Sequence, residues 1–177
     1  MSIERNTHRF GNLVETSGVP IALEWLNSGV PHRYSAIYRF QNEMFENLYF
    51  YDKNRQPIAE FLEFIPFEVS FCQYVSHKDS FSINNSALDP RLDGHMFQGI
   101  VMSYPGVPLF DELGCVCGTL CHFDEVAFPI SDSELKMLKQ ASRGMPAELL
   151  MERSPRSAHR AQDAGDGVRT GRSARSK

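Results

Sequence analysis

Four cysteines are the residues of this 177-residue chain best able to do chemistry, and three of them fall in one apolar run. In a regular strand, Cys115, Cys117 and Cys121 share one face. At about 3.3 Å per residue, Cys117 and Cys121 are then about 13 Å apart. A zinc ion, with bonds to sulfur of about 2.3 Å, cannot bridge that distance, and a disulfide requires Cα atoms within about 7 Å. The spacing therefore favours small buried residues, and no metal site is predicted.

Cys72 stands apart from the other three, in the segment Ser70-Phe71-Cys72-Gln73-Tyr74-Val75. A catalytic or redox-active thiol needs a lowered pKa and a base in contact with it, and His95 or His122 would have to supply that base. The sequence contains no nucleophile elbow, no Gly-rich phosphate loop and no pair of carboxylates with catalytic spacing. Packing of Cys72 against a sheet is favoured, and thiol chemistry stays open as the alternative.

The most polar cluster is the stretch 89–95, Asp-Pro-Arg-Leu-Asp-Gly-His. Arg91 offers a planar guanidinium for a carboxylate or phosphate, and His95 can donate or accept a hydrogen bond near neutral pH. Neither completes a recognisable triad. The alternative is structural, because Asp89 and Arg91 can instead pin their own loop through bonds to the backbone.

His122 and the nearby aromatic residues fit a buried apolar environment. A buried neutral imidazole needs a hydrogen-bond partner, for which Asp124 or Tyr104 is predicted, so a core histidine is favoured over a ligand contact. Small-molecule sites combine apolar walls with a few polar groups. On this basis the predicted ligand-binding residues are Phe71, Cys72, Tyr74, Asp89, Arg91, His95, Tyr104, Cys121 and Phe123. No catalytic residue is assigned, and the sequence does not identify a cofactor.

A hairpin must position several of these side chains. The apolar runs 106–110 and 115–123 are separated by Asp-Glu-Leu-Gly, a polar turn that ends in glycine. Two extended runs joined in this way predict an antiparallel hairpin. The second run is apolar at nearly every position, so we expect both of its faces to be covered, as in the middle of a sheet.

The elements before this hairpin follow from local patterns. Residues 1–16 show no clear period and are predicted to be a loose lead-in. A short helix is predicted from Gly18, with Ser17 as its cap, Pro20 in its first turn and Gly29 in a left-handed conformation after its end. Residues 34–40 and 44–51 predict a second hairpin.

The middle of the chain is expected to form a cover over the sheet. Apolar residues between Ile58 and Ile65 recur at helical spacing and predict a short helix that ends before Pro66. The mixed apolar patch within 69–75 fits either a helix or a strand, and a short strand is predicted at 81–83. A loop near 14 residues, 86–99, is long for a compact domain, and such loops tend to be functional.

The chain ends with a helix and a polar tail. Ser131 and Glu134 form a capping box at the start of a helix whose buried stripe contains Leu135, Leu138 and Ala141. A final turn or two is expected at 147–151. Residues 154–177 are rich in Ser, Arg, Gly and Ala, and predict a disordered basic tail. The ordered domain is predicted to span 17–153.

These elements predict an α+β fold. We expect an antiparallel sheet of five or six strands with the terminal helices on one face. Short helices and loops would cover the other face, with a pocket whose floor is 115–123 and whose roof is 70–100.

Composition limits the kinds of partner. The net charge is −4, and residues after Arg153 contain six basic and two acidic side chains, which leaves −8 on the rest. An acidic body argues against nucleic-acid binding. No apolar run approaches the roughly 20 residues that cross a bilayer, and no signal peptide is visible. A cytoplasmic protein without nucleic-acid or membrane partners is therefore predicted.

The order of motifs resembles that of GAF domains, a family of small-molecule sensor modules with a profilin-like sheet. The resemblance rests on Gly-Val-Pro-Leu at 106–109, Gly-Thr-Leu-Cys-His-Phe-Asp at 118–124, and the segments 31–40, 70–75 and 89–95. The chain is similar in these segments to small stand-alone bacterial GAF proteins, and this resemblance implies a role in signal transduction. It also implies an unknown small ligand, a homodimer formed through the terminal helices and a separate effector protein.

Two other activities occur on this scaffold. Free methionine sulfoxide reductases use cysteines, and a thiol-dependent reductase using Cys72 with Cys121 or Cys117 is the alternative function. The cysteine and acid motifs associated with that subfamily are not visible. Cys121-His122 copies the Cys-His pair of tetrapyrrole-binding members, but a central strand leaves no room for a covalent chromophore.

Overall fold

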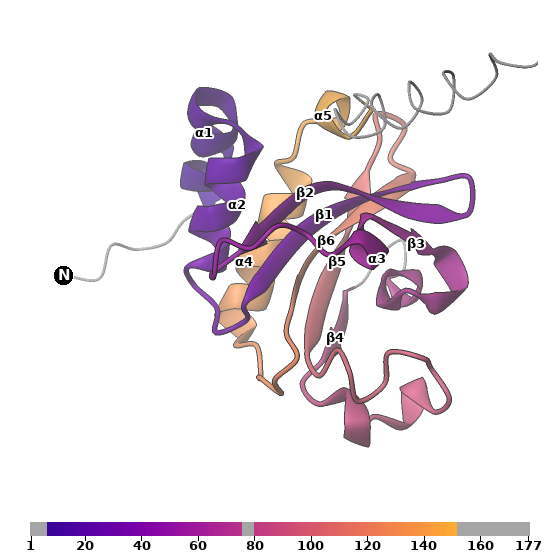
Figure 1. The fold of residues 1–177 in the computed structure, drawn as a ribbon. Helices are drawn as coiled ribbons and strands as arrows, with labels where there is room; N and C mark the ends of the chain where they lie inside the picture. The colour runs from indigo at the N-terminus through magenta and orange to yellow at the C-terminus, as the bar shows by residue number, and fades with distance from the viewer. Residues whose placement is uncertain (1–6, 76–79, 152–177) are drawn as a thin grey trace, which may run out of the picture.

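A computed structural model describes residues 7–75 and 80–151. Its centre is one antiparallel sheet with the strand order β3-β2-β1-β6-β5-β4. The strands are β1 (Tyr34–Gln41), β2 (Met44–Asp52), β3 (Phe64–Pro66), β4 (Phe81–Ile83), β5 (Tyr104–Phe110) and β6 (Val116–Phe123). This confirms the α+β class, and Figure 1 shows helices covering both faces of the sheet.

The predicted hairpin of β5 and β6 is confirmed at the centre of this sheet. Asp111 holds its turn, because its Oδ1 accepts hydrogen bonds from the backbone N–H groups of Leu113 at 2.9 Å and Cys115 at 2.8 Å. Gly114 takes the left-handed conformation that favours glycine, with φ 76°. β6 lies between β1 and β5, and its residues 118–123 are all buried, so both faces are covered as predicted.

An irregularity in β6 corrects the expected placement of the cysteines. Leu109 pairs with Gly118 and Phe110 with Val116, so Cys117 is an extra residue in a bulge. Cys117 packs against the core on the helix side, whereas Cys121 belongs to the core on the opposite side. The prediction that Cys115, Cys117 and Cys121 share one face is therefore wrong.

Four helices pack on one face of the sheet, as predicted: α1 (Thr7–Ser17), α2 (Val19–Asn27), α4 (Asp132–Arg143) and α5 (Ala147–Met151). The prediction of a loose lead-in over 1–16 is wrong from Thr7 onward, since Phe10 and Val14 are buried one turn apart on α1. Residues 1–6 lie outside the described ranges. In residues 7–75 and 80–151, no helix combines the length and apolar character needed to cross a bilayer.

The ends of these helices follow the predicted chemistry in part. Ser131 caps α4 by accepting a hydrogen bond from the Glu134 N–H at 3.2 Å. Pro20 lies in the first turn of α2 as predicted, but Gly18 rather than Ser17 is the N-cap. Ser28 continues in the right-handed helical conformation and donates its hydroxyl to the Trp25 carbonyl at 2.6 Å, and Gly29 is not left-handed.

Short elements cover the opposite face. They are α3 (Glu60–Glu63), η1 (Phe67–Val69), η2 (Phe71–Tyr74), η3 (Ser86–Leu88) and η4 (Pro90–Leu92), where η marks a 3-10 turn. The helix predicted up to Ile65 is reduced to one turn, because Phe64–Pro66 pairs with β2 as β3. The predicted basic tail, 154–177, lies outside the described residues.

A buried ion pair joins the sheet to the last helix. The guanidinium of Arg39 on β1 donates to the Glu46 carboxylate on β2 at 2.5 Å, and it also donates to the Leu150 carbonyl at 3.3 Å. Both charged side chains are only 10% exposed. Arg39 therefore links two strands to the C-terminal end of α5.

Two stacked histidines, His32 and His122, are buried near the end of α2, where the Asn27 amide donates to the His32 carbonyl at 3.1 Å. His122 Nδ1 lies 2.6 Å from the Ser35 hydroxyl, a partner that was not predicted from the sequence beside Asp124 and Tyr104. The His32 ring stacks on it with centroids 6.1 Å apart. No described residue hydrogen-bonds to either His32 nitrogen. Burial lowers the pKa of His32 to about 4, a shift that Asp124 opposes and Lys53 reinforces.

This burial predicts a loss of stability in mild acid. Below its ordinary pKa of 6.5, His32 takes up a proton in the unfolded chain, but the folded chain resists it down to about 4. Stability is therefore complete above pH 6.5 and falls by about 2–3 kcal/mol as the pH drops to 4. Burial also lowers the pKa of His95, which adds a loss of the same sign. Urea unfolding from pH 7 to 4 measures the slope, and His32→Phe should flatten it. An unchanged slope in the variant would exclude His32 as its cause.

Candidate functional site

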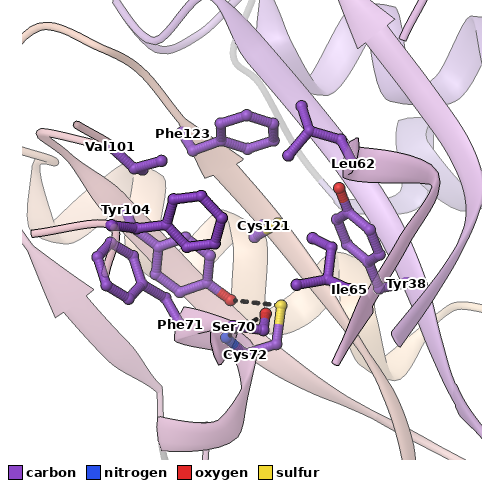
Figure 2. A pocket seen from close by; sticks show the side chains of 11 residues that line it. Tyr38, Leu62, Ile65, Ser70, Phe71, Cys72, Val101, Tyr104, Cys121 and Phe123 are labelled. Carbon is purple, nitrogen blue, oxygen red and sulfur yellow. Dashed lines mark hydrogen bonds between the residues drawn. The ribbon is translucent and has the colours of Figure 1, made fainter. Parts of the chain in front are cut away.

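A pocket lies between the sheet and its cover of short elements, with about 390 Å³ of empty space including its mouth. Figure 2 shows side chains from both layers around it. The lining residues are Tyr38, Leu62, Ile65, Ser70, Phe71, Cys72, Phe97, Val101, Tyr104, Cys121 and Phe123. This is the floor and roof arrangement expected from the sequence, with a roof that begins at Leu62 rather than at residue 70.

Three neighbouring strands supply the floor. Cys121 and Phe123 lie on β6, Tyr38 on β1 and Tyr104 on β5. In a strand, alternate residues share a face, so Cys121 and Phe123 point to the pocket while Leu120 joins the core under the helices. The same strand therefore contacts the pocket with one face and the terminal helices with the other.

Cys72 is the most polarised group on the pocket wall. Tyr104 donates its hydroxyl to the Cys72 sulfur at 3.2 Å, and Thr119 donates its hydroxyl at 3.1 Å. Burial opposes ionisation of this thiol, but hydrogen bonding to Cys121, Ser70, Thr119 and Tyr104 outweighs it and lowers the pKa of Cys72. Burial raises the pKa of Cys121. Any thiolate of the pair therefore resides on Cys72.

Gly106 makes the contact between Tyr104 and Cys72 possible. A Cβ atom at position 106 would lie 2.5 Å from the Tyr104 hydroxyl oxygen and 2.6 Å from its ring. The absence of a side chain there lets the Tyr104 ring lie along β5, which directs its hydroxyl to Cys72. This glycine is required by close packing rather than by its backbone angles.

The Tyr38 hydroxyl is an unsatisfied polar group on the same wall. Tyr38 is 2% exposed, and no described residue makes a hydrogen bond to its hydroxyl. Burial raises the pKa of Tyr38, and the neighbouring Asn47 side chain opposes this shift. A buried hydroxyl without a partner costs free energy that a bound molecule can recover. In Figure 2 the Tyr38 hydroxyl points into the space below Leu62.

The structure brings together some of the predicted site residues and separates others. Phe71, Cys72, Tyr104, Cys121 and Phe123 all line the pocket. The remaining four, Tyr74, Asp89, Arg91 and His95, are not among its lining residues.

Arg91 and Asp89 form the structural arrangement that the sequence left open. Arg91 donates to the Asp89 carboxylate at 2.9 and 2.5 Å and to the Ser82 carbonyl on β4 at 2.9 Å. Asp89 also caps η4 through the Arg91 N–H. Their polar groups fasten their loop to β4, so the structure favours the structural role of Asp89 and Arg91, while their contact with a ligand stays a prediction.

His95 and Tyr74 lie behind the pocket wall. The His95 ring packs on Phe71, with centroids 4.6 Å apart, and on Tyr74 at 5.9 Å. Its Nδ1 accepts a hydrogen bond from the Phe97 N–H at 3.2 Å. His95 therefore supports Phe71 from behind and is not a pocket base for Cys72.

Sequence reasoning missed six lining residues: Tyr38, Leu62, Ile65, Ser70, Phe97 and Val101. A signal existed for Tyr38, because it follows Tyr34 and Ala36 at alternate positions of a predicted strand and therefore shares their face. The others depend on how the cover folds back over the sheet. In the described ranges, no group of three or more His, Cys, Asp or Glu residues is arranged to hold a metal ion.

Comparison with known proteins provides structural neighbours alone, because no family model and no curated protein sequence matches this chain. The GAF domain of a phosphoenolpyruvate-protein phosphotransferase from Acinetobacter is 14% identical with a TM-score of 0.63, over 87% of this chain and 92% of that one. A putative GAF sensor protein from Burkholderia vietnamiensis is 15% identical with a TM-score of 0.61, over 82% and 94%.

An enzyme shares the same architecture. Free methionine-R-sulfoxide reductase from Neisseria meningitidis, solved in complex with its substrate, is 16% identical with a TM-score of 0.62, over 86% of this chain and 89% of that one. At these identities the likeness concerns the fold. The strand order, the two covered faces and these neighbours together show that the chain has the GAF fold.

Proposed function

We propose that this chain is a GAF-type module that binds a small, neutral and largely apolar molecule carrying one hydrogen-bond acceptor. The observation that carries this proposal is the buried, unpartnered Tyr38 hydroxyl on the wall of an otherwise apolar pocket. Apolar walls with few polar groups are typical of small-molecule sites. An acceptor on the ligand would satisfy Tyr38, while the aromatic walls would bury the rest of the molecule.

The charge of the wall narrows the ligand class. None of the described residues that line the pocket is an Asp, Glu, Lys, Arg or His. Burying an unpaired charge is costly, so carboxylates, amino acids and cyclic nucleotides are disfavoured as ligands. Arg91 lies in the cover, but its guanidinium is bound by Asp89.

Three related probes test this ligand class. Acetophenone has an aromatic body and one carbonyl acceptor, isopropylbenzene has the same shape without the acceptor, and 4-acetylbenzoate adds a charge. We expect acetophenone to raise the melting temperature most and 4-acetylbenzoate not at all. Ligand at 100 times its Kd stabilises a protein by about 2.7 kcal/mol, which a thermal scan resolves. Stabilisation by the charged probe alone would reject the proposal.

Tyr38→Phe should stabilise the ligand-free protein. The substitution removes a buried hydroxyl that has no partner, a group whose burial costs about 1–3 kcal/mol. We therefore expect the free energy of unfolding to stay level or to rise, as measured by urea denaturation. Tyr104→Phe is the matched control, because it removes the hydrogen bond to Cys72 and should lower stability. A loss in Tyr38→Phe equal to that of the control would mean that the Tyr38 hydroxyl is satisfied in the free protein.

We propose that the terminal helices transmit the signal that a ligand is bound. β6 contacts the pocket through Cys121 and the helix core through Leu120, so a shift of the floor on binding would reach α4 and α2. We propose that these helices form a homodimer or contact a separate effector protein in signal transduction. We propose a bacterial, cytoplasmic setting, and the bacterial sources of the structural neighbours support its bacterial part.

A thiol-dependent reductase is the second candidate, favoured by the polarised Cys72 and the likeness to the Neisseria enzyme. The apolar wall disfavours it, because free methionine sulfoxide carries a carboxylate and an ammonium group that need partners. We expect no turnover when the chain is incubated with free methionine sulfoxide and a dithiol reductant. Turnover that disappears in Cys72→Ser would overturn our choice between the two functions.

A further inference from the structure

Cys72 and Cys121 approach one cavity from its two opposite layers. Cys72 lies on η2 in the roof and Cys121 on β6 in the floor, and both line the pocket. They are 4% and 1% exposed, and both are free thiols. Cys115 is exposed and Cys117 packs on the helix side of the sheet, so neither shares this position.

The contacts of Cys72 place its sulfur above the stretch of β6 that contains Cys121. Thr119, which touches the sulfur at 3.1 Å, precedes Cys121 by two residues on the same face. Tyr104, which touches it at 3.2 Å, lies along Gly106, and Gly106 is the residue paired with Cys121 across β5 and β6. Two independent contacts therefore bring the Cys72 sulfur to the neighbourhood of Cys121.

We propose that Cys72 and Cys121 are a redox-active dithiol that hydrogen peroxide converts to a disulfide. Hydrogen peroxide is small and neutral, so the apolar wall does not exclude it. The donors around Cys72 stabilise the thiolate, which is the form of cysteine that attacks peroxide. Cys121 lies on the opposite layer as the resolving thiol.

The two steps balance without a further reactant. In the first, the Cys72 thiolate attacks one oxygen of hydrogen peroxide, the O–O bond breaks, and the departing hydroxide takes up the proton that the thiol released on ionisation to form water. Cys72 is oxidised by two electrons to a sulfenic acid. In the second, the Cys121 sulfur attacks the Cys72 sulfur, the S–O bond breaks, and hydroxide leaves with the Cys121 proton as water. Two thiols and one peroxide thus become one disulfide and two water molecules.

The disulfide would fasten the roof to the floor. η2 makes its polar contacts to the floor through Tyr104 and Thr119, and the bond would replace these contacts by a covalent link to β6. The disulfide would alter how a ligand enters the pocket, and this effect on ligand entry rests on the proposed function. We expect acetophenone to associate with and leave the oxidised protein more slowly than the reduced protein. Unchanged rates would remove this regulatory consequence.

Thiol counting tests the disulfide itself without any ligand. The full chain is reduced, freed of reductant and treated with hydrogen peroxide, and the remaining thiols are titrated in denaturant. The four free cysteines should fall to two, with Cys72 and Cys121 joined in one pair of peptides by mass mapping. Loss of no thiol, a disulfide between other cysteines, or oxidation of Cys72 without a disulfide overturns the proposal.

Variants separate the pair from the other thiols. Cys117→Ser should still lose two thiols to peroxide, whereas Cys72→Ser should lose none. Tyr104→Phe keeps both cysteines and serves where Cys72→Ser fails to fold. The titratable side chains facing Cys72 are Cys121, Tyr104 and Tyr38. Removal of the Tyr104 donor should slow the reaction severalfold and move its pH midpoint upward, which loss of packing alone would not do. Because no probe ligand is present, failure of acetophenone binding leaves this result unaffected.

Discussion

Arg39→Met should lower the free energy of unfolding by about 3–5 kcal/mol, the range observed when one partner of a buried ion pair is removed. Methionine fills much of the space of the arginine stem but leaves the Glu46 carboxylate in the core, where it is 10% exposed. The substitution also removes the donor to the Leu150 carbonyl. Urea denaturation at pH 7 measures the loss, and the contacts of α5 should weaken first.

The control is the double variant Arg39→Met with Glu46→Leu. Replacing both charges by apolar groups of similar volume is often neutral or stabilising, so most of the lost stability should return. If the single variant loses less than about 1 kcal/mol, the pair behaves as a solvent-exposed salt bridge. That result would mean that α5 does not cover Arg39.

Leu120→Ala should lower the free energy of unfolding by about 2–5 kcal/mol, because a fully buried leucine leaves a cavity when truncated. Leu120 is 0% exposed and packs under the terminal helices from the middle of β6. The matched control is Leu113→Ala in the β5–β6 turn, where the side chain is 88% exposed. The control should change stability by no more than about 0.5 kcal/mol.

The contrast between these two leucines tests whether β6 is covered on its helix side. A loss in Leu120→Ala near that of Leu113→Ala would show that the terminal helices do not pack on β6. Cys121→Ala probes the other face of the same strand, and it removes a smaller group. It should therefore cost less than Leu120→Ala while still exceeding the surface control.

The elements that could be predicted are those whose chemistry is local. The β5–β6 hairpin follows from a turn that contains Asp111 and Gly114 and from an apolar run with no polar alternation. The start of α4 follows from the Ser131 cap. Each of these two elements is determined by residues that are close together in the sequence, so tertiary packing does not alter the predicted structure.

Elements that depend on distant partners were missed. Among the described side chains of α1, Phe10 and Val14 are buried, and this short apolar stripe is recognisable as part of a helix only because it packs into the core with residues of α2 and α4. Ile65 fits a helical pattern, but pairing with Phe45 draws it into β3. The bulge at Cys117 arises because β6 must match the register of β5. In all three cases a tertiary partner outweighs the local preference.

In the candidate site, too, residues determined by local pattern could be predicted, and residues that depend on distant partners could not. Cys121 and Phe123 could be placed from strand alternation, and Phe71 and Cys72 from their position in the cover. For Arg91 the sequence left two roles open, because it does not show that the Asp89 carboxylate and the Ser82 carbonyl both accept hydrogen bonds from its guanidinium. Tyr38 was missed because an unsatisfied hydroxyl is a property of its surroundings, which form when the roof closes over β1.

The most direct test of the account measures the affinities of acetophenone and isopropylbenzene for the wild-type protein and for Tyr38→Phe by calorimetry. A hydrogen bond between the ligand carbonyl and the Tyr38 hydroxyl contributes about 0.5–1.5 kcal/mol. Acetophenone should therefore bind the variant roughly 2- to 12-fold more weakly. Isopropylbenzene should bind both proteins equally or prefer the variant. Equal losses for the two probes, or binding of neither to the wild-type protein, would contradict a ligand site organised around Tyr38.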